Sequence, residues 1–180
     1  MAKSQNNVVT HGLSGKIGDL LVFSQRGGKT IVSTKSNKPR TFKEKQKEQI
    51  RRFQYASLYA KAAQLSAEYQ DAATKEKTAC VIAVADFLKA PSIEQVDLSA
   101  YTGRPGDTIR IRVIDNFAVK SVVVRITNGD GSLVEEGAAQ SANFEWVYTA
   151  TVNNNSLDGD KIEIFASDTP GNITQEDFVL

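Results

Sequence analysis

The residues of this chain that come nearest to a chemical motif are Gly-Lys-Thr at positions 28–30, which match the end of a phosphate-binding loop. A complete loop has a glycine five residues earlier and opens into a helix, so that backbone N–H groups surround the phosphates. Position 23 is Phe23, and residues 30–34 are mostly β-branched, which favours a strand over a helix. The segment therefore predicts a β-hairpin in which Gly27 and Gly28 supply positive φ.

Other catalytic side chains are scarce. Cys80 is the only cysteine and His11 the only histidine. The chain therefore lacks most of the residues that the active sites of zinc hydrolases, cysteine proteases and Ser-His-Asp hydrolases require. We expect Cys80 to be buried in an apolar helix and His11 to lie on the surface. Asp86 ends an apolar run, as a magnesium-binding aspartate of a nucleotide site does, but the alanine content of that run indicates a buried helix. We predict no enzyme, no catalytic residue and no cofactor.

Six aspartates lie in or beside predicted turns: Asp107, Asp115, Asp130, Asp158, Asp160 and Asp168. Calcium sites of β-sandwiches gather oxygen ligands in such turns. Aspartates in turns also bind their own backbone N–H groups. We favour the second explanation and predict no metal site.

The composition is that of a globular protein, with 41% hydrophobic and 24% charged residues. No stretch reaches the roughly 18–20 apolar residues of a membrane span, and the first residues lack the apolar core of a signal peptide. We therefore expect a cytoplasmic or particle-bound protein without a membrane partner. The net charge of +1 hides an asymmetry: twelve Lys or Arg stand against three acids through residue 52, whereas fifteen acids stand against seven bases from residue 81 onward.

The first half of the chain predicts a small β-ribbon followed by helices. Strands are expected at 8–10, 17–23 and 30–34, and a ribbon of this size is marginal in water without a cover. Thr41 and Glu44 have the spacing of a capping box that starts a helix. Along that helix an apolar stripe runs through Ile50, Phe53, Ser57, Ala60 and Ala63. Shorter helices are predicted at 66–73 and 78–89, giving a domain over residues 1–90 in which the helices pack on the ribbon.

Residues 91–180 predict a second domain made of strands alone. Alternating segments at 95–98, 108–114, 121–127, 133–136, 145–152, 161–167 and 175–179 are separated by turn-forming residues. Seven short strands in this arrangement favour an immunoglobulin-like β-sandwich, with Trp146 as a core aromatic residue. The predicted fold class is therefore α+β, with the N-terminal ribbon and helical cluster followed by an all-β sandwich.

Two parts of the sequence resemble known families. The segments SGKIGDLLVF at 14–23, RGGKT at 26–30 and QIRRF at 49–53 resemble an uncharacterised family of small bacterial proteins associated with phage-like gene neighbourhoods. The C-terminal half resembles bacterial immunoglobulin-like domains, on the segments DNFAVKSV at 115–122 and ASDTPGN at 166–172. The resemblance implies a structural or adhesive module rather than an enzyme.

Three functions are consistent with these features. The first is a structural protein that self-assembles or decorates a larger particle, such as a virion or phage tail, with other copies or particle proteins as partners. Its assembly hairpin would comprise Val22, Phe23, Arg26, Gly27, Gly28, Lys29 and Ile31. The second is a carbohydrate- or protein-binding adhesive module. The third is nucleic-acid binding through a basic face formed by Lys35, Lys38, Arg40, Lys43, Lys47 and Arg51.

Overall fold

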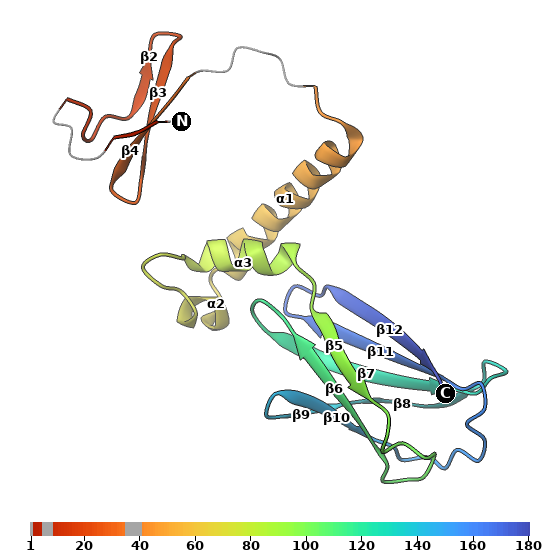
Figure 1. Cartoon of the computed structure of the whole chain (residues 1–180). Helices are drawn as coiled ribbons and strands as arrows, with labels where there is room; N and C mark the ends of the chain where they lie inside the picture. Colours follow the sequence, from red (N-terminus) through yellow and green to blue (C-terminus); the bar gives the residue numbers. More distant parts are fainter. Residues whose placement is uncertain (1, 5–8, 35–40) are drawn as a thin grey trace. The chain divides into compact units, whose positions relative to one another are not determined.

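The computed structural model of the chain describes residues 2–4, 9–34 and 41–180 (Figure 1). Contacts divide the chain into two compact units, residues 1–43 and residues 44–180. The predicted boundary at residue 90 differs from this division, because the helices that follow residue 43 contact loops at one end of the C-terminal strands. The coarse expectation of an α+β chain rich in strands is confirmed.

The first unit is an antiparallel sheet with the strand order β1-β4-β3-β2. Its strands are β1 (Ala2–Ser4), β2 (Gly15–Ile17), β3 (Leu21–Arg26) and β4 (Lys29–Thr34). The β3–β4 hairpin has the predicted two-residue turn: Arg26 pairs with Lys29, and the glycines between them have φ of 54° and 71°. Two successive positive φ values match the strand twist of a hairpin, and only glycine adopts them without strain.

Two predicted strands of this unit are wrong. The one at 17–23 is divided between β2 and β3 by a turn at residues 18–20, and the one at 8–10 is not formed. Val9 and Thr10 lie in a turn, and Val8 is outside the described residues. Glycines at 12, 15 and 18 with positive φ break the chain into turns on both sides of β2, so the loop between β1 and β2 cannot continue as a strand.

The second unit begins with three helices, α1 (Glu44–Ala63), α2 (Ala67–Asp71) and α3 (Ala79–Leu88). They share a small core of Ala60, Tyr69, Ala79 and Ala83. The predicted apolar stripe of α1 is buried only in its C-terminal half, since Ala60 is fully buried whereas Ile50 and Phe53 are 40% and 54% exposed. Helix α1 begins at Glu44, two residues later than the Thr41 capping box predicts. No helix in the described part of the chain is long and apolar enough to cross a membrane.

The rest of the second unit is a sandwich of two antiparallel sheets, seen in the green and blue strands of Figure 1. One sheet has the order β5-β6-β10-β9, formed by β5 (Ser92–Asp97), β6 (Thr108–Ile114), β10 (Glu145–Thr149) and β9 (Gln140–Ala142). The other has the order β12-β11-β7-β8, formed by β12 (Ile173–Val179), β11 (Lys161–Asp168), β7 (Val119–Thr127) and β8 (Leu133–Ala138). All seven predicted strands are present, and the short β9 is the one that sequence reasoning missed.

The sandwich core lies between the two sheets and follows the alternation in the sequence. Ile109, Ile111 and Val113 of β6 point inward, while the arginines between them are exposed. Val124 of β7 and Ile164 of β11 face them from the second sheet and are fully buried. Trp146 packs against this core as predicted.

The helices are joined to one end of the sandwich by specific contacts. The ring of Tyr69 from α2 stacks on Phe117 of the β6–β7 loop, with centroids 4.5 Å apart. The side-chain amide of Asn172, in the β11–β12 turn, donates to the carbonyl oxygens of Asp86 and Phe87 at the end of α3. Thr174 donates to the carbonyl oxygen of Pro91, just beyond α3. These bonds satisfy helix C-terminal carbonyls and make the helices part of the same unit as the sandwich.

Candidate functional site

The N-terminal sheet has one apolar and one basic face. Residues directly opposite each other on neighbouring strands share a face, so the register places Ile17, Leu21, Phe23 and Val32 together. The opposite face carries Lys16, Val22, Arg26, Lys29 and Ile31. The predicted assembly hairpin is therefore split between the faces: Phe23 lies on the apolar face, and Val22, Arg26, Lys29 and Ile31 lie on the basic one.

The apolar face is covered only in part. Gln25 donates through its Nε2 atom to the carbonyl oxygen of Leu13 and to Thr30 Oγ1, both at 2.8 Å, so the loop before β2 crosses this face. Beneath it Phe23 is 8% exposed. Beyond the loop, Ile17 is 57% exposed and Leu20, in the β2–β3 turn, is 78% exposed.

The predicted basic face is only partly within the described residues. Lys35, Lys38 and Arg40 lie outside them. Lys47 and Arg51 are exposed and lie four residues apart on one side of α1, whereas Lys43, also exposed, precedes that helix. The ammonium group of Lys47 lies 2.6 Å from Glu44 Oε1. Both side chains of this ion pair are exposed, as is typical of a solvated helix surface.

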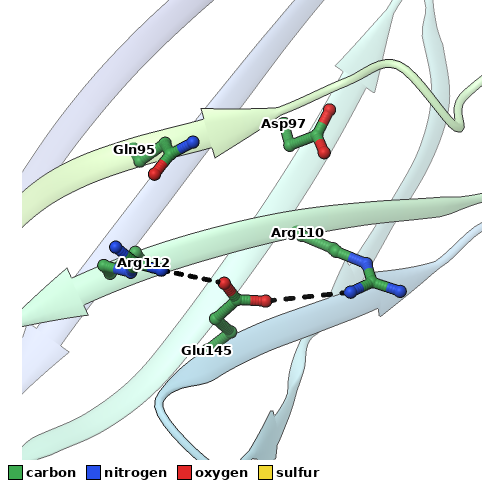
Figure 2. A pocket seen from close by; sticks show the side chains of 5 residues that line it. All are labelled: Gln95, Asp97, Arg110, Arg112 and Glu145. Carbon is green, nitrogen blue, oxygen red and sulfur yellow. Dashed lines mark hydrogen bonds and ion pairs between the residues drawn. The ribbon is translucent and has the colours of Figure 1, made fainter.

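Figure 2 shows a shallow depression on the outer face of the β5-β6-β10-β9 sheet, lined by Gln95, Asp97, Arg110, Arg112 and Glu145. Glu145 Oε1 accepts a hydrogen bond from Arg112 at 3.2 Å, and Oε2 lies 4.0 Å from Arg110 Nη1. Hydrogen bonds from the side chain and backbone of Ser99 lower the pKa of Asp97. These bonds favour the ionised form of Asp97. The depression has a volume of about 140 Å³, below the roughly 300 Å³ of small-molecule pockets. We therefore interpret it as the surroundings of a surface ion pair and not as a ligand-binding pocket.

A group of three carboxylates lies where α3 meets the sandwich. Asp86 comes from the last turn of α3, Asp115 follows β6, and Asp168 ends β11. Each offers one carboxylate oxygen to a common position, and these three oxygens lie within 4.8 Å of one another. Asp86 and Asp168 are buried, and Asp115 is half-buried.

Most of the remaining carboxylate oxygens in this group have well-placed donors. Asp115 Oδ2 accepts from the backbone N–H groups of Phe117 and Ala118 at 3.0 Å. Both oxygens of Asp168 accept from Asn172 at 2.6 Å, one from its backbone N–H and one from its side-chain amide. Tyr69 donates its hydroxyl hydrogen to Asp86 Oδ2. These donors fix the orientation of the three side chains.

Two oxygens of the group have no hydrogen-bond partner among the described residues: Asp86 Oδ1 and Asp115 Oδ1. Burial raises the pKa of Asp86 from its ordinary value of 3.8 to about 6. The Tyr69 hydrogen bond opposes the rise, whereas the charges of Asp115 and Asp168, and a hydrogen bond from protonated Asp86 to Asp115, add to it. The position between the three carboxylates is therefore strongly negative and lacks a hydrogen-bond donor.

Sequence reasoning identified two of these three aspartates and dismissed them. The favoured explanation holds for Asp107, which binds the backbone N–H groups of Thr102 and Arg104, and for Asp130, which binds that of Ser132. Asp160 instead accepts from the side-chain amide of Asn154. Asp115 and Asp168 also bind local backbone N–H groups, but each has an oxygen within 4.8 Å of an oxygen of Asp86. Asp86 was missed as a partner, although it is the only charged residue in the apolar helix 79–88. A lone acid in such a helix must be buried with a partner.

The single cysteine and the single histidine both lie among the described residues. Cys80 is half-buried beside the helical core rather than fully buried, because it lies at the edge of α3. His11 is exposed in the loop before β2, as predicted.

Comparison with known proteins identifies no family. No family model matches the sequence, and no curated protein matches it. Among solved structures, CopC from Methylosinus trichosporium OB3b is similar over 49% of this chain and 88% of that chain, with a TM-score of 0.37 and 15% identity. A similarity at this level carries no argument about function.

Proposed function

We propose that this protein is a non-enzymatic structural protein that assembles with further copies of itself through its N-terminal sheet. The observation that carries the proposal is the core of the first unit: within its described residues Phe23 is the one buried apolar side chain. A sheet of this size needs a larger buried face for independent stability. A partner that covers Ile17 and Leu20 would supply the missing apolar contact.

The charges of the two units argue that the partner is a second copy of this chain. Residues 1–43 contain eight Lys or Arg and one acid, whereas residues 44–180 contain fourteen Lys or Arg and twenty acids. The basic face of one sheet therefore complements the acidic second unit of another copy. Such a head-to-tail contact repeats and builds rings or filaments.

In this proposal the sandwich is an immunoglobulin-like module that stays exposed on the assembled particle, which would be virion-like or phage-tail-like. A non-enzymatic role is supported by Figure 2, where the surface carboxylate of Glu145 is paired with Arg110 and Arg112. Binding of carbohydrate or protein at the sandwich loops, and nucleic-acid binding through the basic residues, are the alternatives that the experiment separates.

The first test is the molar mass of the full chain by light scattering, at about 50 mM and about 1 M salt. We expect a regular oligomer at low salt that dissociates at high salt, because screening weakens exposed charge contacts. The triple variant Lys16→Glu, Arg26→Glu, Lys29→Glu should be a monomer at both. A charge-matched control in the second unit, Lys75→Glu, Lys77→Glu, Lys89→Glu, should keep the wild-type mass.

A second pair of variants tests the apolar contact. Leu20→Ser should lower the oligomer mass, whereas Leu133→Ser, which changes an exposed leucine of the sandwich, should leave it unchanged. A monomer under every condition would refute the proposal. If that monomer retains DNA with a steep salt dependence, nucleic-acid binding is the better function, and if it retains glycans, the adhesive function is.

A further inference from the structure

We propose that Asp86, Asp115 and Asp168 form a calcium-binding site that ties helix α3 to the end of the sandwich. The site lies in the second unit and is independent of assembly through the N-terminal sheet. It uses residues that come from three separate segments, so that it exists only in the folded protein.

The first argument is the unpartnered oxygens. Asp86 is fully buried, and its Oδ1 atom has no hydrogen-bond partner in the described part of the chain. A buried polar atom without a partner costs about 1–3 kcal/mol, and more when it is charged. Asp115 Oδ1 is also buried without a hydrogen-bond partner among the described residues, and Asp115 belongs to the same group of carboxylates. A cation between them satisfies both oxygens at once.

The second argument is the balance of charge. Three carboxylates converge here, and the charges that act on Asp86 are those of Asp115 and Asp168, both of them negative. Buried charges in proteins are paired or bind metals. The remaining neighbours are neutral: Tyr69, which donates to Asp86, and Asn172, which holds Asp168. The side chains are thus held in place for a positive charge that the protein itself does not supply.

The chemistry of the ligands favours calcium among hard divalent cations. The three oxygens lie within 4.8 Å of one another, so one calcium ion, which binds oxygen at about 2.3–2.6 Å, can contact all of them. Calcium accepts several carboxylates in a flexible shell, whereas magnesium usually keeps several waters and binds one or two carboxylates. Oxygen ligands alone, without His or Cys, also suit calcium.

The competing explanation is a proton shared between Asp86 and Asp115. A shared proton would satisfy the same two oxygens, and the fold would then be most stable at acidic pH. A calcium site predicts instead that added calcium stabilises the neutral protein. The two explanations therefore differ in the response of chelator-treated protein at pH 7.5 to added calcium: a calcium site predicts a rise in stability, whereas a shared proton predicts no change.

The experiment measures calcium binding to the full chain by calorimetry and its thermal midpoint with and without calcium. A bound ion at 100 times its dissociation constant raises the midpoint of a chain this size by about 5–10 °C. Asp115→Asn is the main variant, because its amide oxygen can still accept from Phe117 and Ala118 while its NH₂ group faces Asp86 Oδ1. We expect this variant to fold, to lose calorimetric binding and to show no calcium-dependent rise.

Asp86→Asn provides a second variant with the same expected loss, and Asp130→Asn provides the control. Asp130 lies in an exposed turn outside the group, and asparagine can keep its bond to Ser132. The control should respond to calcium as the wild type does. The proposal is overturned if the wild type binds no calcium, if Asp115→Asn responds as strongly as the wild type, or if magnesium raises the midpoint and calcium does not.

Discussion

Replacing Asp86 with asparagine should stabilise the protein at pH 8 in the presence of a chelator. The change keeps the shape of the side chain and removes the charge that repels Asp115 and Asp168. Asparagine can accept from Tyr69 through its oxygen and donate to Asp115 Oδ1 through its nitrogen. The variant therefore supplies the missing donor at the point where wild-type protein without calcium has two unpartnered oxygens.

The size of the effect follows from the pKa of Asp86, which folding raises from 3.8 to about 6. The folded state holds this proton more tightly than the unfolded state does, so the contribution of Asp86 to stability is largest below pH 3.8. It is lost as the pH rises through 6. The difference between the two pKa values corresponds to about 3 kcal/mol in the free energy of unfolding. A weaker bond from Tyr69 offsets about 1 kcal/mol of the gain in the variant.

The assay is urea unfolding of wild type and Asp86→Asn at several pH values in chelator. We expect the variant to be about 2 kcal/mol more stable at pH 8, equivalent to about 4–8 °C in the thermal midpoint. Its advantage should disappear by pH 4.5, because protonation then stabilises the wild type. A variant that is less stable than wild type at pH 8, or an advantage that does not change with pH, would refute the electrostatic reasoning.

Two further predictions concern the sandwich. A Cβ atom at Gly103 would overlap the carbonyl oxygen of Asn154, whereas one at Gly106 would meet open space, and both glycines have positive φ. Gly103→Ala should therefore lower the free energy of unfolding by at least about 2 kcal/mol more than Gly106→Ala, and equal losses would show that the close approach has no cost. Ile164→Ala should lower the free energy of unfolding in urea by about 2–5 kcal/mol, because Ile164 is fully buried. Ile173→Ala should lower it by about 0.5 kcal/mol or less, because Ile173 is 66% exposed. Similar losses for the two variants would contradict the assigned core.

Local patterns in the sequence determined most of the secondary structure. Alternation places Ile109 and Ile111 on one face of β6 because side chains of a strand point to opposite sides in turn. The hairpin turn at Gly27 and Gly28 follows from their access to positive φ. These features depend on residues within a few positions of each other, and so they could be read without a structure. The short strand β9 could not, because its polar sequence gains strand geometry only from pairing with β10.

The tertiary structure alone decided which elements pack together. An apolar stripe shows that a helix has a partner but does not name it, so the sequence could not show that α3 packs on the sandwich. It likewise could not show that Asp86 meets Asp115 and Asp168, because their approach depends on how the end of a helix is seated against two strand ends. Secondary structure is encoded by neighbouring residues, whereas the candidate cation site is created by the docking of three distant segments.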